Sequence, residues 1–185
     1  MRTFHPLAVG IAAALSLAGA CDAATMVLGG GMAEDCYKAA RANSTDLASL
    51  EVCTQAVEQE ALTPHDLAAT LVNRSVILLG RGEYAAAAHD LDRAISLRPD
   101  LAEAYVNRGA ARVGLKQYRD AITDLDRGLA LGAPEPAKAW YDKGLAYEDL
   151  GDLQQAYDDY KKASELRPDW QLPKDELKRF TVKQG

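Results

Sequence analysis

The chain has 185 residues, a formal net charge of −6 and 48% hydrophobic residues. This length suits one domain of ordinary size that can bury a core. Because the 21 basic residues are interleaved with 27 acidic ones, no positive stripe is available for phosphate groups, and nucleic acid is not an expected partner.

Residues 1–24 have the pattern of a secretory signal peptide. A single basic residue, Arg2, is followed by an uncharged run from Leu7 to Ala20 and then by small residues. The run is too short for a membrane span. A buried core helix is the alternative, but the run lacks an amphipathic polar face. We therefore expect an exported protein of the bacterial periplasm.

Cys21 leaves two maturation routes open. The stretch Ala18-Gly19-Ala20-Cys21 resembles a bacterial lipoprotein box in its last three residues, although Leu17 lies four residues before the cysteine, where such boxes prefer three. Ordinary cleavage after Ala23 or Ala24 would discard the cysteine. Lipidation of Cys21 is thus the only membrane anchoring that we expect, and soluble and lipid-anchored forms both stay open.

The next two segments precede the main body of the chain. Residues 25–32 contain three successive glycines, and we expect a flexible leader. No Gly-Lys-Ser/Thr follows these glycines, so the segment is not a phosphate loop. From 33 to 62, apolar residues recur at helical spacing on both sides of a turn at 43–45. This pattern predicts a degenerate N-terminal helix pair.

Two cysteines lie in that helix pair. Cys36 and Cys53 fall in its two antiparallel helices, each several residues from the turn, so their side chains can face each other. Because an exported protein enters an oxidising compartment, we predict a disulfide between them. Two buried, reduced cysteines are the alternative. A redox or metal role is less favoured, since the spacing matches neither Cys-x-x-Cys nor a recognised zinc pattern.

The stretch from Ala68 to Asp169 repeats three times at a period of 34 or 35 residues. With Ala68, Ala102 and Ala137 as position 1, the units cover 68–101, 102–136 and 137–170. Large residues occupy positions 4, 17 and 24, where they can fill gaps left by small ones. Repeats of this length predict a solenoid in which neighbouring units share a core. The small residues, at positions 8, 20 and 27, are Ser75, Gly109, Gly144, Ala87, Ala121, Ala156, Ala94, Gly128 and Ala163.

These positions, together with Pro99 and Pro168 at position 32, resemble the tetratricopeptide repeat family. The resemblance implies an all-α fold, a right-handed α-solenoid of antiparallel helix pairs. Four departures stand out. The second unit has Ala133 at position 32 and an extra residue within 131–136, and Ser75 replaces a glycine. At position 7, where the family usually has leucine, the three units carry Arg74, Arg108 and Lys143.

Short breaks separate the two helices of each unit, and the chain ends on a further helix. The breaks are Gly80-Arg81-Gly82, Gly114-Leu115-Lys116 and Leu150-Gly151-Asp152, where glycine can adopt a left-handed backbone. Residues 171–185 predict a capping helix and tail that cover the open end of the array. We expect Trp170 to pack there rather than to bind a ligand.

No catalytic pattern emerges from the sequence. His5 lies in the signal segment, and His65 and His89 each lack a neighbouring histidine or glutamate for metal binding. The repeated carboxylates lie beside Arg93, Arg127 and Lys161, which predicts a solvated helix face with weak ion pairs. We therefore expect no enzyme, no cofactor and no metal. These carboxylates are Asp90, Asp92, Asp124, Asp126, Asp158 and Asp159.

The resemblance also implies a concave groove lined by the first helices of the units. Asparagines there can hydrogen-bond a peptide backbone, and apolar residues can accept its side chains. Packing against neighbouring units is the alternative for the valines. The groove residues are Val72, Asn73, Val76, Leu79, Val106, Asn107, Ala110, Val113, Lys138, Tyr141, Asp142, Leu145 and Glu148.

One family activity fails on these residues. Tetratricopeptide clamps that hold the C-terminal carboxylate of cytosolic chaperones would match at Asn107 and Lys138, but Val72, Val76 and Asp142 do not fit. We therefore predict an interaction adaptor that binds a protein or peptide segment in the bacterial cell envelope. The alternatives are a lipoprotein assembly factor, or an accessory regulatory subunit of an envelope machine for secretion or the cell wall.

Overall fold

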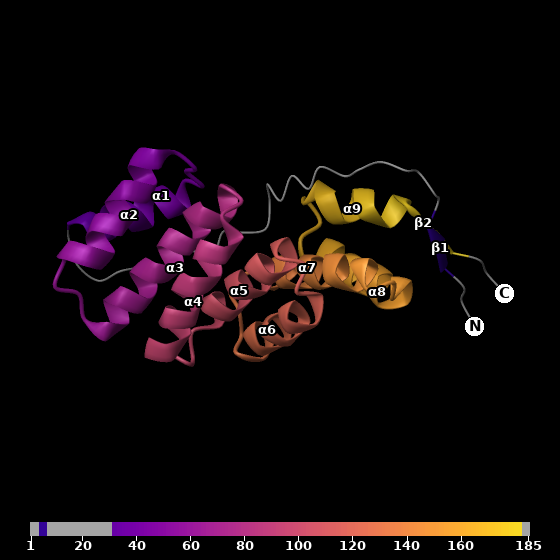
Figure 1. Cartoon of the computed structure of the whole chain (residues 1–185). Helices are drawn as coiled ribbons and strands as arrows, with labels where there is room; N and C mark the ends of the chain where they lie inside the picture. The colour runs from indigo at the N-terminus through magenta and orange to yellow at the C-terminus, as the bar shows by residue number, and fades with distance from the viewer. Residues whose placement is uncertain (1–3, 7–30, 183–185) are drawn as a thin grey trace.

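The computed structural model describes residues 4–6 and 31–182, which form a row of stacked helices (Figure 1). The fold class is confirmed: these residues build an α-solenoid of helix pairs. Two three-residue strands, β1 (Phe4–Pro6) and β2 (Phe180–Val182), pair antiparallel at one end of the row. The helices are α1 (Met32–Arg41), α2 (Leu47–Gln59), α3 (Pro64–Gly80), α4 (Tyr84–Leu97), α5 (Ala102–Gly114), α6 (Tyr118–Ala130), α7 (Pro136–Asp149), α8 (Leu153–Leu166) and α9 (Gln171–Lys178).

The helices stack in chain order, from α1 and α2 at one end to α8 and α9 at the other (Figure 1). Within the units, α3 packs on α4, α5 on α6, and α7 on α8. The first helices α3, α5 and α7 also contact one another in turn, while α4 and α6 pack against the first helix of the following unit. The first helices therefore form a continuous layer, which is the layer expected to carry the groove.

Small residues permit the close approach of paired helices. A Cβ atom added to Gly109 would lie 2.5 Å from Cγ of Leu125, and one added to Gly144 would lie 2.6 Å from the ring of Tyr160. Such distances are too short for carbon atoms in contact, so a side chain at either glycine would force the helices apart. The alternation of small and large residues in the repeat thus has its predicted packing role.

The turns between paired helices place a left-handed residue at position 15 of each unit. Gly82 has φ 76° and Gly151 has φ 83°, but Lys116 occupies the same place in the second unit with φ 61°. Glycine adopts this conformation at little cost, whereas lysine does not. The prediction of a left-handed glycine in every break is wrong for the second unit, where Gly114 still belongs to α5.

The N-terminal helix pair is held by a disulfide and a cap. Cys36 on α1 and Cys53 on α2, the two cysteines paired from the sequence, are joined with their Cα atoms 4.7 Å apart and pack against Ile77 of α3. The carboxylate of Glu60 accepts hydrogen bonds from the backbone N–H groups of Met32 and Ala33, at 2.7 and 2.9 Å. These bonds satisfy donors that the first turn of α1 leaves free.

Aromatic side chains close the other end. The ring of Trp170 lies 4.9 Å from that of Tyr141, which in turn lies 5.6 Å from that of Tyr160. Leu172 and Leu177 of α9 pack against the same cluster. Trp170 therefore packs, as predicted.

Some of the sequence predictions concern residues that the structure does not describe. Apart from residues 4–6, the predicted signal segment, including Cys21, lies outside the described residues, as does most of the leader at 25–32. Within the described ranges, no helix combines the length and the apolar character needed to cross a bilayer.

A row of ion pairs runs between the two helices of each unit, and we call it the ionic ladder. Arg74 donates two hydrogen bonds to Asp90, both at 2.7 Å, and Arg108 donates two to Asp124, at 2.8 and 2.7 Å. Asp90 and Asp124 are only 2% and 3% exposed. The expected solvated face is therefore wrong for these carboxylates, because the cations at position 7 of the first helix draw them inward.

The ladder also crosses from unit to unit. Arg108 donates to Asp92 of the preceding unit at 2.7 Å, and Nζ of Lys143 lies 2.7 Å from Asp126 of its own preceding unit. In the third unit, the buried Asp159 takes the place of Asp90 and Asp124, and one of its oxygens has no hydrogen-bond partner. Burial, partly opposed by Lys143, raises the pKa of Asp159 to about 6.

Candidate functional site

The predicted groove residues divide into two groups in the structure. Four apolar residues, Val72, Leu79, Val106 and Val113, belong to hydrophobic clusters that join one unit to the first helix of the next. Their side chains serve the shared core, as the packing alternative anticipated. They therefore leave the polar members of the set to define the character of the surface.

Two further predicted residues are engaged by the C-terminal end. The hydroxyl of Tyr141 lies 3.3 Å from Glu176 of α9, and Trp170 covers its ring. Glu148 accepts a hydrogen bond from Tyr160 at 2.9 Å and pairs with Arg179 at 2.7 Å. Burial and the Glu176 carboxylate raise the pKa of Tyr141, so its hydroxyl stays protonated. Tyr141 and Glu148 therefore bind the C-terminal segment that contains α9. Leu145, on the same helix α7, is half-buried.

A polar row follows position 6 of the three first helices. Asn73 on α3, Asn107 on α5 and Asp142 on α7 are each at most 1% exposed. Because α3, α5 and α7 contact one another in turn, the row runs along the array. Val76 and Ala110, at position 9, are also buried, at 3% and 1% exposed. We use the term concave surface for positions 2, 6 and 9 of these helices.

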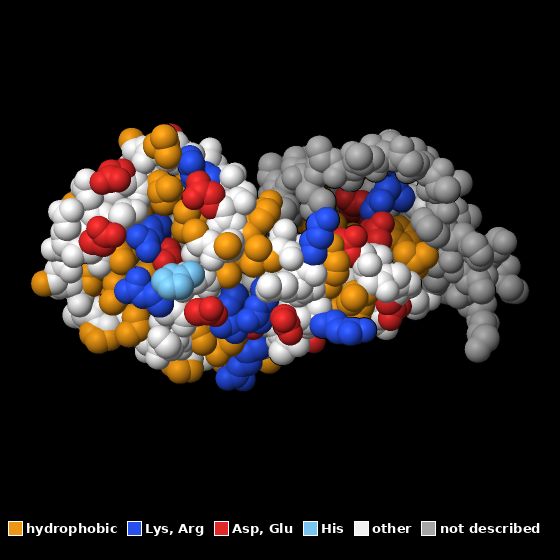
Figure 2. All heavy atoms as spheres, in the orientation of Figure 1, with side chains coloured by type: hydrophobic (Ala, Val, Ile, Leu, Met, Phe, Trp, Pro, Cys, Tyr) orange, Lys and Arg blue, Asp and Glu red, His pale blue; other side chains and the backbone are white. Residues whose placement is uncertain are grey.

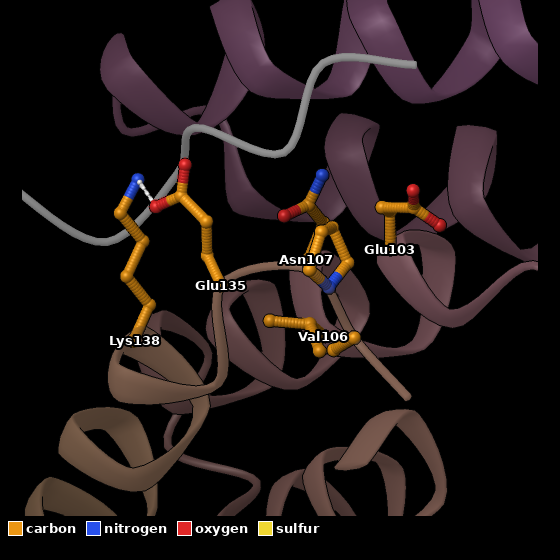
Figure 3. A pocket seen from close by; sticks show the side chains of 7 residues that line it. Glu103, Val106, Asn107, Glu135 and Lys138 are labelled. Atoms are coloured by element: carbon orange, nitrogen blue, oxygen red, sulfur yellow. Dashed lines mark ion pairs between the residues drawn. The ribbon is translucent and has the colours of Figure 1, made fainter. Parts of the chain in front are cut away.

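A small pocket opens on this surface between α5 and α7 (Figure 3). Glu103 and Asn107 of α5 project to the same side as Lys138 and Glu135 (Figure 3). Glu135 is the residue just before α7, and its carboxylate lies 2.8 Å from Nζ of Lys138. Val106, Ala133 and Pro134 complete the lining. The pocket therefore combines two carboxylates, one amide and one ammonium above an apolar floor.

Sequence reasoning missed both carboxylates of the pocket. Glu103 stands at position 2 of the second unit, the counterpart of Lys138, so the repeat frame contained the signal that could have found it. Glu135 lies in the stretch 131–136, where the extra residue of the second unit interrupts the frame. The repeat pattern predicts the insertion there, but it does not predict a role for the inserted side chains.

Asp142 is the least satisfied side chain of the surface. It is 0% exposed, and neither carboxylate oxygen has a hydrogen-bond partner. Burial raises the pKa of Asp142 well above the ordinary value, and Lys138 one turn earlier opposes this. A buried carboxylate of this kind is costly unless a donor or cation meets it.

The chemistry on this surface is that of binding. Among the described residues, no group of three or more histidine, cysteine or acidic side chains could hold a metal ion. His65 and His89 each lie beside the carboxylate of the next residue, Asp66 and Asp90. Amides, carboxylates and an ammonium on rigid helices can instead meet the polar groups of a bound chain. The fold defines a helical-repeat protein.

Comparison with known families indicates which kind of helical-repeat protein the chain resembles. Residues 77–116 match a family model described as TPR repeat, and residues 137–169 match one described as tetratricopeptide repeat. These two matches, together with the solved structures below, support the tetratricopeptide repeat family, whose domains generally mediate interactions between proteins. No curated protein matches the chain.

Several solved structures share the fold. MamA from Desulfovibrio magneticus RS-1, residues 41 to the end, is 26% identical with a TM-score of 0.62, and the alignment covers 80% of this chain and 82% of that one. The first TPR domain of human RPAP3 is 27% identical, with a TM-score of 0.57 and coverage of 63% and 90%. The second TPR domain of human RPAP3, solved in complex with the HSP70 peptide SGPTIEEVD, is 26% identical, with a TM-score of 0.56 and coverage of 63% and 96%.

Proposed function

We propose that the protein is an interaction adaptor that binds an extended protein segment along its concave surface. The observation that carries this proposal is the polar row at Asn73, Asn107 and Asp142, one residue from each first helix. The peptide complex of the second RPAP3 domain supports the same kind of ligand. Scaffolding without catalysis is typical of tetratricopeptide proteins.

The binding mode follows from the chemistry of the row. An asparagine amide carries both a donor and an acceptor, and this kind of side chain at position 6 suits the N–H and C=O groups of a ligand backbone. Packing of Val72 and Val106 into the shared core fixes the helices on which these amides sit. A rigid surface loses little conformational entropy on binding, and this favours affinity.

We place this function in the bacterial cell envelope, exported and either soluble or anchored through a lipidated Cys21. The proposal rests on the uncharged run from Leu7 to Ala20 and on the disulfide between Cys36 and Cys53. Disulfides persist in oxidising compartments and are rare in the cytosol. Mass determination of the mature N-terminus tests the anchor: a diacylglycerol adduct on Cys21 supports it, and an unmodified later residue contradicts it.

Site-specific photo-crosslinking in cells tests the adaptor function. The crosslinker replaces Glu103 at the pocket or Leu145 on α7, and the matched control replaces Arg119, an exposed residue of α6. We expect a discrete adduct from the first two positions and none from the control. Adducts from Arg119 alone would place the working surface on the second helices and contradict the proposal.

A further inference from the structure

We infer that the bound segment presents an arginine or lysine side chain to the concave surface formed by α5 and α7, where Glu103 of α5 and Asp142 of α7 receive it. This inference rests on the proposed function and adds the chemistry of the partner. It follows from two carboxylates to which the described residues provide no hydrogen bond and no ion pair, although the charge of Lys138 acts on Asp142.

Asp142 provides the first argument. Its two oxygens have no hydrogen-bond partner although the residue is 0% exposed. Lys138, one turn earlier on α7, acts on Asp142 through its charge, but its Nζ lies 2.8 Å from a carboxylate oxygen of Glu135. Nζ of Lys143 lies 2.7 Å from Asp126. A carboxylate with both oxygens available matches the paired N–H groups of a guanidinium, which can satisfy both at once.

Glu103 provides the second argument, independent of the first. It is half-buried at the pocket and its carboxylate projects to the same side as the Asn107 amide (Figure 3). Within the described ranges, no side chain forms an ion pair or hydrogen bond with this carboxylate.

The charge balance indicates the same class of partner. The pocket is lined by the carboxylates of Glu103 and Glu135 and by the ammonium of Lys138. Glu135 pairs with both Lys138 and Arg167, at 2.8 and 3.6 Å. Asp142, one turn after Lys138 on α7, adds a third carboxylate on the concave surface. Such a surface attracts a cationic segment and disfavours an acidic one. The peptide SGPTIEEVD, seen with the second RPAP3 domain, is acidic near its end. This chain would select against that chemistry at Asp142.

Two pools of labelled nonapeptides test the inference on the full chain. Both pools carry uncharged residues at random, but one has a central arginine and the other has citrulline, which keeps the shape and lacks the charge. We expect the arginine pool to bind at least roughly tenfold more tightly by fluorescence anisotropy, because a hydrogen bond to a charged group contributes this much.

Three isosteric variants locate the effect. Asp142→Asn should abolish most of the preference for arginine, and Glu103→Gln should reduce it. Asp120→Asn, an exposed carboxylate on α6, should leave it unchanged. Circular dichroism checks the fold of each variant. Burial already disfavours the charged form of Asp142 and raises its pKa, so we expect Asp142→Asn to cause no loss of stability.

The outcomes distinguish a failure of this inference from a failure of the proposed adaptor function. Equal binding of both pools to the wild-type chain would overturn this inference and leave the adaptor function standing. Binding of neither pool would count against the adaptor function and the inference together. A preference for arginine that survives in Asp142→Asn and Glu103→Gln alike would also overturn the inference, because the cation would then be held elsewhere.

Discussion

The second and third units solve the same packing problem with different cations. In the second unit, Arg108 meets Asp124 with two hydrogen bonds and Asp92 with a third. In the third, Lys143 reaches Asp126, and the buried Asp159 keeps one oxygen without a partner. A guanidinium has donors for two carboxylates at once, whereas an ammonium acts as a single point of charge. The two units therefore differ in how well their buried charges are satisfied.

Removal of a well-satisfied cation should have the largest effect. In Arg74→Met, Asp90 would stay buried without its cation, and we expect a loss of about 3 kcal/mol in the free energy of unfolding. Urea denaturation measures this loss. Adding Asp90→Asn should recover a substantial part of it, because the uncompensated charge is then gone. A single variant as stable as the wild type would show that the ladder contributes nothing.

In the third unit, we expect Asp159 to make the stability of the protein depend on pH. Because the folded state raises the pKa of Asp159 to about 6, the protonated form is favoured on folding. That contribution is complete below the ordinary carboxyl pKa of about 4 and is lost as the pH rises through about 6. We expect the urea midpoint to fall between pH 5 and pH 7.5, and to fall less in Asp159→Asn. The two proteins differ only at residue 159, so the difference between their pH dependences reports Asp159.

Exchanging Lys143 for arginine tests whether the cation explains the difference between the second and third units. Lys143→Arg supplies the donors that the second unit has, so the pKa of Asp159 should drop and the pH dependence should shrink toward that of Asp159→Asn. The measurement is the same urea titration at both pH values. An unchanged pH dependence would mean that the identity of the cation does not explain the difference between the units.

The smallest expected effect lies in the turn of the second unit. Lys116 has φ 61° where the other units have glycine. Lys116→Gly should raise the free energy of unfolding by about 1 kcal/mol, because the left-handed backbone costs a lysine roughly that much. Gln117→Gly, in the same turn at negative φ, is the matched control and should not stabilise.

The repeat frame predicted the fold because spacing alone fixes which residues share a helix face. Position 8 glycines and position 24 large residues met as expected, since both lie inside one unit. The groove was harder to predict. Whether Val106 lines a surface or packs on Ala139 depends on how two units are inclined to each other, and this is not encoded in one unit's pattern.

The buried carboxylates were misjudged for a related reason. Asp90 lies three residues before Arg93, so local spacing suggested an exposed pair, but the guanidinium of Arg74 from the facing helix binds it. The signal was present, because every unit with a cation at position 7 also has an aspartate at position 23. A cation at position 7 and an aspartate at position 23 that recur together in every unit indicate a contact between the two positions. Either residue type alone does not.

The ionic ladder also bears on how the array comes apart. Arg108 and Lys143 each hold a carboxylate of the preceding unit, so the second and third units share bonds with the units before them. In linear repeat proteins, such terms between neighbours decide whether repeats melt one by one or together. Fraying of an end unit here would break a bond that its neighbour also uses, and the three units should therefore unfold as one cooperative block.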